Sequence, residues 1–305
     1  MRFLTDERIR IGSAALTAEI SPRGAELMSL RAADGEEYLW QGDPSIWADR
    51  SPILFPVVGR LAGDVLRVDG RDCPMPIHGF ARAMKFAVAQ LSDSSAMFSV
   101  RATEATLASY PWDFGLDVHY TITGATLAIS LAVSNHSDRP MPFMLGLHPG
   151  FRWPLSAAAP RESHYLEFEH DESIDMEIGR NGFRGTERRA VGLLNRRLPL
   201  SDELFNRGAA IFPAPLSHSV RFATADPAPF IKLDFSGFEH LALWTRPGAS
   251  YLCIEPWQTL PHAEHAPPDL AHAPMLRRGE SANYVASVTI GCDVSVRDAG
   301  PRLAE

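Results

Sequence analysis

Residues 116–133 read Leu-Asp-Val-His-Tyr-Thr-Ile-Thr-Gly-Ala-Thr-Leu-Ala-Ile-Ser-Leu-Ala-Val. Two runs rich in apolar and β-branched residues, 116–123 and 126–133, flank the Thr123-Gly124 turn. Glycine adopts backbone conformations that other residues avoid, so a glycine between two such runs is typical of a β-hairpin. The stretch therefore predicts two long antiparallel strands. We expect His119, inside the first strand, to be packed or to face solvent.

Short strands separated by turn residues are predicted along most of the chain, and strong amphipathic helix patterns are scarce. The only helix expected here is a brief one at residues 106–109. This pattern is typical of an all-β sandwich, largely antiparallel with few short helices. No break in composition divides the 305 residues, so we expect a single domain over residues 1–305, with a loose tail after about residue 297. The further expected strands are residues 11–20, 25–32, 86–91, 96–103, 217–223, 230–235, 241–245, 251–254 and 283–292, and residues 65–71 are expected to form a hairpin arm that turns at Asp69-Gly70.

The composition argues against several classes of protein. A formal net charge of −8 disfavours a general nucleic-acid or anionic-membrane surface, which needs an excess of Lys and Arg. The three cysteines, Cys73, Cys253 and Cys292, have no metal-binding or CxxC spacing, which favours a reducing compartment without disulfides. There is no apolar segment of signal-peptide or membrane-spanning length. We expect a cytoplasmic protein, monomeric or homodimeric, with no nucleic-acid or membrane partner.

Residues 146–151, Gly-Leu-His-Pro-Gly-Phe, contain a candidate functional histidine. His148 ends an apolar run and directly precedes a proline, which restricts the backbone of the residue before it. The imidazole is therefore expected to be held in place where the chain turns. Because the free pKa of histidine is near neutrality, this side chain can accept or donate a proton at working pH. The alternative interpretation is a structural histidine at the end of a strand.

Two other segments offer partners for this histidine. Residues 76–82, Pro-Ile-His-Gly-Phe-Ala-Arg, supply His78 and the forked donor Arg82. Residues 251–257, Tyr-Leu-Cys-Ile-Glu-Pro-Trp, place Glu255 after an apolar strand, where a carboxylate must be paired, hydrogen-bonded or functional. Trp257 offers a ring face on which the C–H face of a sugar stacks. We predict that His78, His148 and Glu255 share one sugar-binding cleft.

Structural alternatives remain for the charged residues. Glu255 can instead form a buried ion pair with Arg60 or Arg246. Residues 51–61 contain two prolines, which predicts an irregular loop that delivers Arg60 either to a ligand or to an ion pair. His262 and His265 have the H-x-x-H spacing of a metal site on a helix, but their proline-rich surroundings favour a loop, so we expect no metal there.

Taken together, these segments resemble the aldose 1-epimerase (galactose mutarotase-like) superfamily, in particular its shorter LacX-like bacterial branch. The similarity covers nearly the whole chain, in order. It runs through Trp40-Gln-Gly-Asp43, residues 50–60, His78-Gly-Phe-Ala-Arg82, Tyr110-Pro-Trp-Asp-Phe114, Gly146-Leu-His-Pro-Gly-Phe151, Leu204-Phe205 and Cys253-Ile-Glu-Pro-Trp257.

The resemblance implies a β-supersandwich with an open cleft and a reaction without metal or cofactor. By matching motif, Glu255 would remove the proton of the anomeric hydroxyl and His148 would protonate the ring oxygen. The ring then opens, the aldehyde end rotates, and reclosure gives the other anomer. His78 would hydrogen-bond the sugar, and Arg60, Arg82 and Trp257 would bind it.

One departure from the superfamily concerns the sugar-binding aspartate of galactose mutarotases. The corresponding place reads Leu204-Phe-Asn-Arg-Gly208, so Asn206 or the nearby Asp202 would have to replace it. Related epimerases bind hexose 6-phosphates with arginines, which Arg50, Arg60 and Arg82 could supply.

Two other functions stay open. One is a carbohydrate-binding or sensing protein without turnover. The other is a glycoside hydrolase that pairs Glu255 with Asp234 or Glu239.

Overall fold

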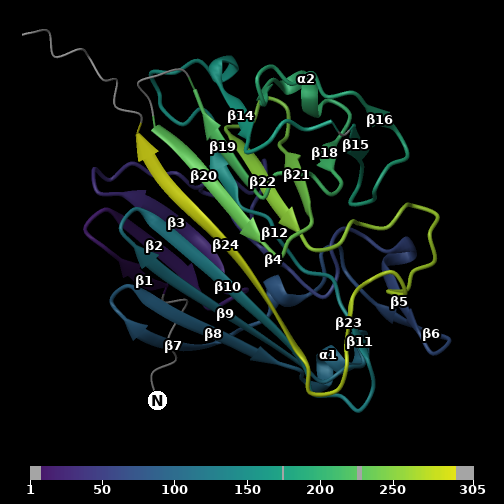
Figure 1. Cartoon of the computed structure of the whole chain (residues 1–305). Helices are drawn as coiled ribbons and strands as arrows, with labels where there is room; N and C mark the ends of the chain where they lie inside the picture. The colour runs from purple at the N-terminus through teal and green to yellow at the C-terminus, as the bar shows by residue number, and fades with distance from the viewer. Residues whose placement is uncertain (1–7, 174, 225–228, 293–305) are drawn as a thin grey trace, which may run out of the picture.

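Two large antiparallel sheets form the body of the molecule (Figure 1). The computed structural model describes residues 8–173, 175–224 and 229–292, and the expected loose tail lies outside them. The first sheet has nine strands, in the order β17 (Arg197–Pro199), β14 (Tyr165–Phe168), β19 (Ser219–Ala223), β20 (Pro229–Ser236), β24 (Ser281–Cys292), β10 (Thr126–Asn135), β9 (Phe114–Thr123), β8 (Ser95–Arg101) and β7 (Ala87–Ser92).

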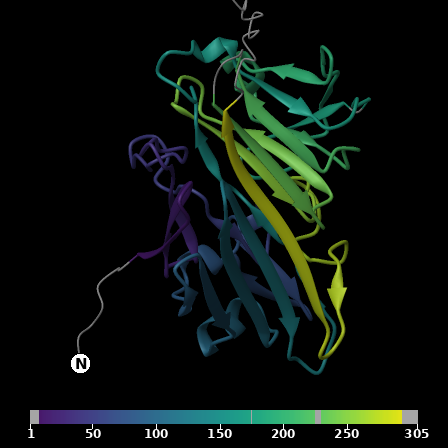
Figure 2. The ribbon, with the colours of Figure 1, turned by 60° about the vertical axis from the view of Figure 1, so that its left-hand side comes forward.

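The second sheet has eight strands and carries Glu255 and Trp257, two of the residues predicted to be functional. Its order is β16 (Arg188–Arg189), β15 (Met176–Gly179), β18 (Ala209–Phe212), β21 (His240–Trp244), β22 (Tyr251–Trp257), β12 (Gly146–Leu147) and β4 (Ile53–Leu54), with β13 (Gly150–Arg152) also paired to β22. Figure 2 shows the long strand β24 of the first sheet, in yellow, running diagonally across the view.

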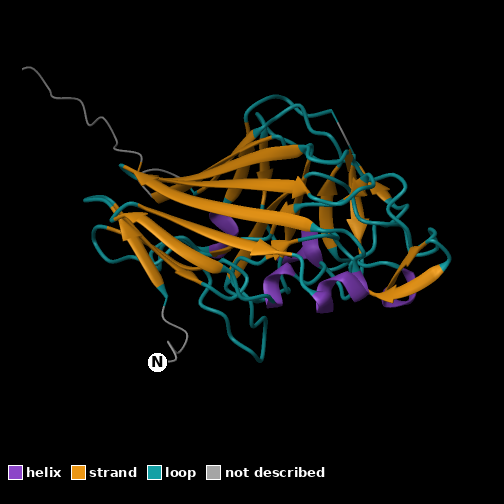
Figure 3. Ribbon diagram, turned by 90° about the horizontal axis from the view of Figure 1, so that it is seen from below, coloured by secondary structure: helices purple, strands orange, loops and turns teal. Residues whose placement is uncertain are grey.

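Smaller elements complete the described chain. Helices are few and short, as Figure 3 shows, and none of those described is long and apolar enough to cross a membrane. The remaining elements are a three-stranded sheet of β1 (Ile9–Gly12), β2 (Leu16–Ser21) and β3 (Glu26–Ala32), the pairs β5 (Val65–Val68) with β6 (Arg71–Pro74) and β11 (Met141–Pro142) with β23 (Met275–Leu276), helices α1 (Glu104–Ser109) and α2 (Asp202–Phe205), and 3-10 turns Ala62–Asp64, Ala81–Ala83 and Arg161–Ser163.

The hairpin predicted from residues 116–133 is confirmed as β9 and β10. Thr123 pairs with Thr126 across the turn, and Gly124 there has a φ of 58°. Burial alternates along both strands, as expected when one face of a sheet packs on the core. The inward side chains of these strands, among them Leu116, Val118 and Leu131, belong to a large core cluster with residues from the second sheet. The all-β prediction is thereby confirmed.

Two strand predictions need correction. Residues 11–20 form parts of two strands, β1 and β2, because Ser13 turns the chain: its Oγ accepts hydrogen bonds from Ala15 and Leu16 N–H, both at 3.0 Å. The strand predicted at residues 251–254 continues to Trp257 and passes through Pro256. Glu255 therefore lies within a central strand rather than beyond its end.

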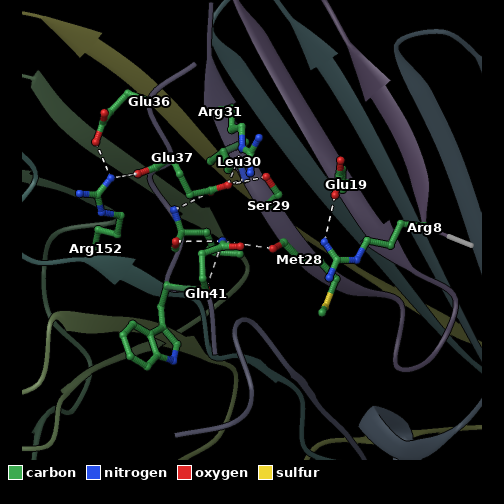
Figure 4. A network of polar contacts seen from close by, with 12 residues as sticks. Arg8, Glu19, Met28, Ser29, Leu30, Arg31, Glu36, Glu37, Gln41 and Arg152 are labelled. Atoms are coloured by element: carbon green, nitrogen blue, oxygen red, sulfur yellow. Dashed lines mark hydrogen bonds and ion pairs between the residues drawn. The ribbon is translucent and has the colours of Figure 1, made fainter. Parts of the chain in front are cut away.

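The partly buried carboxylate of Glu37 anchors the segment that leads from β3 toward the second sheet (Figure 4). Glu37 Oε1 accepts hydrogen bonds from the Leu30 N–H at 2.8 Å and the Leu39 N–H at 3.0 Å. Arg152 of β13 donates to the Glu37 carbonyl at 3.0 Å. These bonds tie the segment to both β3 and β13, so residues 40–50 start from a fixed point next to the candidate site.

Candidate functional site

His148 is held between two glycines whose lack of a side chain makes room for tryptophans. A Cβ on Gly146 would lie 2.8 Å from the Trp257 ring, and one on Gly150 would lie 2.6 Å from the Trp47 ring. The His148 N–H donates to the Pro52 carbonyl at 3.1 Å, which fixes the backbone directly after β12. The glycines of the Gly-Leu-His-Pro-Gly-Phe stretch thus allow indole rings to pack closely around the imidazole.

Glu255 approaches His148 from the neighbouring strand β22. Its neighbours Leu252 and Ile254 belong to the main core, whereas Glu255 points to the opposite face. Glu255 Oε2 lies 3.3 Å from His148 Nε2. The two side chains are almost fully buried, with 2% and 9% of their surfaces exposed. Within the described residues, it is His148, and not Arg60 or Arg246, that lies within ion-pair distance of Glu255.

Burial shifts both members of this pair toward their neutral forms. It raises the pKa of Glu255 well above its usual range, and the nearby Trp257 indole opposes that rise only in part. Burial likewise lowers the pKa of His148 to about 3, and the positive charge of Arg82 adds to the effect. Both shifts favour the arrangement in which the carboxyl of Glu255 keeps its proton and the imidazole of His148 is neutral. Moving this proton across 3.3 Å gives a carboxylate and an imidazolium.

His78 is brought beside this pair by a tight turn. His78 and Gly79 have φ values of 64° and 70°, and a Cβ on Gly79 would lie 2.2 Å from the Phe55 carbonyl oxygen. The Gly59 N–H donates to His78 Nδ1 at 3.1 Å, which leaves Nε2 as the protonated nitrogen of a neutral ring. The His78 and His148 rings lie 5.6 Å apart. Burial, followed by the charges of His148, Arg82 and Arg60, keeps the pKa of His78 well below its usual range.

The structure thus brings together the three side chains predicted to share a cleft. They line one open cavity of about 990 Å³, together with three residues predicted to bind substrate: Arg60, Arg82 and Trp257. Each arginine already has a carboxylate partner, since Arg60 bonds Asp64 at 2.8 Å and Arg82 bonds Asp49 at 2.9 Å.

Two residues predicted to bind substrate lie elsewhere. Asp202 accepts hydrogen bonds from Arg161 at 2.8 Å and from the Gly248 N–H at 3.0 Å, so it joins two loops. Asn206 is exposed at the end of α2. Neither lines the cleft. The reason is local: α2 turns these side chains away, and only the following residues, Arg207 and Gly208, reach the cavity.

Several residues that line the cleft were not predicted from the sequence. Asp49, which orients Arg82, offered no motif beyond its place between Trp47 and residues 50–60. Trp47 and Trp244 flank His148, with ring centroids 5.1 Å and 5.7 Å from its ring. The only hint of these two tryptophans in the sequence was that single tryptophans recur along a chain of short predicted strands.

The cleft is rich in arginine. Three of its arginines, Arg180, Arg207 and Arg246, were not predicted to bind substrate. They come from three separate loops, so no local pattern in the sequence groups them. The arginines that line the cavity are Arg60, Arg82, Arg180, Arg207 and Arg246, against the carboxylates Asp49 and Glu255.

The second carboxylate required for a glycoside hydrolase is not where the sequence suggested. Asp234 lies on β20 in the other sheet, where Lys232 donates to it at 2.7 Å, and Glu239 is exposed. Neither lines the cleft.

Among the described residues, one group of three potential ligand side chains is close enough together to hold a cation. The ligand atoms of His148, Cys253 and Glu255 lie within 4.8 Å of one another. Cys253 is a buried free thiol beneath the tryptophans. The 3.3 Å contact between imidazole and carboxyl is equally the geometry of an acid–base pair, which works without a metal.

Some buried polar atoms of the cleft residues have no hydrogen-bond partner within the described chain. Within the described part of the chain, Glu255 Oε2, His148 Nδ1 and the Trp257 indole N–H are buried and make no hydrogen bond. Buried polar groups are rarely left unsatisfied in folded proteins. A polyhydroxylated ligand offers both donors and acceptors and would satisfy such a set.

The chain is similar to proteins of one family over most of its length. The family model for aldose 1-epimerase matches residues 7–288. The chromosomal protein LacX of Lactococcus lactis subsp. lactis is 31% identical over 262 residues, which cover 83% of this chain and 88% of LacX.

Two solved structures are similar over almost their full lengths. A galactose mutarotase-like protein from Lactobacillus casei superposes with a TM-score of 0.86 at 31% identity, covering 93% of this chain and 100% of its own. A galactose mutarotase related enzyme from Lactobacillus acidophilus also gives a TM-score of 0.86, at 28% identity, covering 93% and 97% of the two chains.

Proposed function

The chain belongs to the aldose 1-epimerase family, and we propose that it is an isomerase that interconverts the α and β anomers of an aldose. The observation that carries the proposal is the contact between Glu255 and His148. The two groups are buried, lie 3.3 Å apart, and line a cleft of about 990 Å³. This volume accommodates a hexose together with a substituent.

The reaction requires one group to take a proton from the anomeric hydroxyl and another to give one to the ring oxygen. We assign these roles to Glu255 as base and His148 as acid. The proton moves from Glu255 to His148 as the sugar enters, and sugar hydroxyls stabilise the charged forms by hydrogen bonding. Removal of the hydroxyl proton and protonation of the ring oxygen break the C–O bond and give the open-chain aldehyde. Rotation about the adjacent C–C bond and the reverse transfers then give the other anomer with no net proton change.

Neighbouring groups hold the sugar for these transfers. The neutral His78 presents its Nε2–H to the cleft as a hydrogen-bond donor. Arg82, oriented by Asp49, offers further donors, and together the two form a polar wall. The Trp257 indole provides an apolar surface at the floor. Fixed donors of this kind favour catalysis because they need no reorganisation when charge develops.

A second candidate substrate, an aldose with an anionic group such as a hexose 6-phosphate, is favoured by the arginines at the cleft edge. Arg180 and Arg207 share one carboxylate, Glu187, so the trio keeps a positive charge. Arg246 adds another guanidinium that lines the same cavity. Arginine forks suit phosphate and carboxylate groups, and a local positive field attracts anions even to a chain with a net charge of −8.

The test is anomer exchange, measured by saturation-transfer NMR on a panel of aldoses and their 6-phosphates. We expect wild-type protein to accelerate exchange for at least one member, Glu255→Gln to lose the acceleration, and Asp202→Asn, outside the cleft, to keep it. A preference for the phosphorylated sugar that Arg246→Ala removes would establish the anionic substrate. Sugar binding without exchange would instead indicate a sensing protein. The absence of both binding and exchange would refute the proposal.

A further inference from the structure

A second cavity, of about 730 Å³, lies on the far side of the loop that forms one wall of the sugar cleft. Pro261 lines both cavities. The backbone there is fixed, because the Arg184 N–H donates to the His262 carbonyl at 2.8 Å and Arg184 pairs with Ala263 in a parallel bridge. The cavity is thus a built feature of the fold, and the proposed epimerase reaction makes no use of it.

His262 is the unusual residue of this cavity. It is 4% exposed, and neither of its ring nitrogens makes a hydrogen bond within the described chain. A buried polar group without a partner is costly. The His272 ring lies 4.3 Å from the His262 ring, at an interplanar angle of 67°. Two imidazoles therefore meet edge to face inside a cavity that is open to solvent.

The charged neighbours show what kind of ligand fits. Glu177 is bonded by Arg184 at 2.8 Å and lies 3.4 Å from Arg188, so this trio keeps one positive charge. Asp269 lines the same cavity and acts electrostatically on His262. The available groups are thus two imidazoles and one carboxylate. Imidazole nitrogens with a carboxylate oxygen are the ligands that Zn²⁺, Co²⁺ and Ni²⁺ prefer.

We propose that His262 and His272 bind one divalent transition-metal ion of the Zn²⁺ class, with water completing its coordination and Asp269 contributing negative charge to the cavity. The H-x-x-H spacing in the sequence offered a different pair, His262 and His265, where the proline-rich surroundings led us to expect no metal. In the structure this segment is a loop and not a helix, and His265 does not line the cavity. The residue beside His262 in the cavity is His272, which lies ten positions after it in the sequence. The inference does not depend on the proposed epimerase activity.

The experiment is isothermal titration of the full-length protein with Zn²⁺ and with Co²⁺, alongside the visible absorption of bound Co²⁺. We expect one ion per chain. Loss of even an indirect partner of a metal ion costs about tenfold in affinity, so His262→Gln and His272→Gln should each weaken binding by at least that factor. His265→Gln is the matched control and should bind as wild type does. Circular dichroism would show that each variant is folded.

The outcomes separate the possible explanations. Absence of binding, or equal binding by the wild type and all three variants, would overturn the proposal. A loss with His265→Gln but not with His272→Gln would favour the pair suggested by the sequence and refute the one assigned here. Because the measurement reads metal binding directly, it gives the same answer whether or not the protein is active on sugars.

Discussion

Replacing Glu255 by glutamine should abolish activity and, unusually, stabilise the folded protein as the pH rises. The variant keeps the shape of the side chain but removes its titration. Glu255 is 1% exposed, and burial raises its pKa well above the value of 4.5 that it has when solvated. Above pH 4.5 the unfolded wild-type chain releases this proton, whereas the native chain keeps it. Stability falls with pH wherever the native state binds more protons, so the wild type loses stability in this window.

The magnitude follows from the proton difference. One extra proton in the native state lowers the free energy of unfolding by about 1.4 kcal/mol per pH unit. While the native carboxyl stays protonated, the advantage of Glu255→Gln over wild type should therefore grow by about 3 kcal/mol from pH 5 to pH 7. His148 has a pKa lowered to about 3 and acts with the opposite sign, adding stability as the pH rises from 3 to 6.5. This contribution is present in both proteins and cancels in the difference.

Urea denaturation of both proteins at several pH values gives the difference directly. Glu239→Gln, at an exposed glutamate, serves as the control and should show no such slope. In parallel, anomer exchange by Glu255→Gln should fall by about 10²–10⁴-fold, the usual contribution of one general acid–base group. A difference in stability that does not change with pH would refute the reasoning, because Glu255 would then titrate as a solvated carboxyl.

Three further predictions test the architecture around the pair. Gly79→Ala should destabilise the protein by about 1–3 kcal/mol more than Gly70→Ala, since both have positive φ but only the former meets a backbone oxygen; equal urea midpoints would contradict this. His78→Gln should lower kcat/KM for the best aldose by about 100-fold through loss of a fixed donor, and unchanged kinetics would remove His78 from the site. Asp202→Asn should leave kcat/KM unchanged but lower the free energy of unfolding by about 1 kcal/mol, as its bonds join two loops; a raised KM would restore the role suggested by the sequence.

The strands and several of the site residues could be predicted because their signals are local. Alternation along residues 116–133 and the glycine between its arms reflect forces between near neighbours, and the hairpin β9–β10 matches them closely. His148 was visible because proline and glycine leave few backbone conformations open to the residues beside them. Asp202 and Asn206 were misplaced because nearness in sequence to a cleft residue, Arg207, does not fix the direction of a side chain at the end of a short helix.

By itself, the sequence determined the all-β class, the positions of most strands and the chemical types that the site would use. Only the tertiary structure decided that Glu255 lies 3.3 Å from His148, that Asp49 orients Arg82, and that His262 meets His272 instead of His265. The physical reason is that strand formation depends on patterns within about ten residues, whereas these contacts join segments whose distance is set by sheet order and loop packing. The shifts in pKa belong to the second group, because burial exists only once remote segments have closed around a side chain.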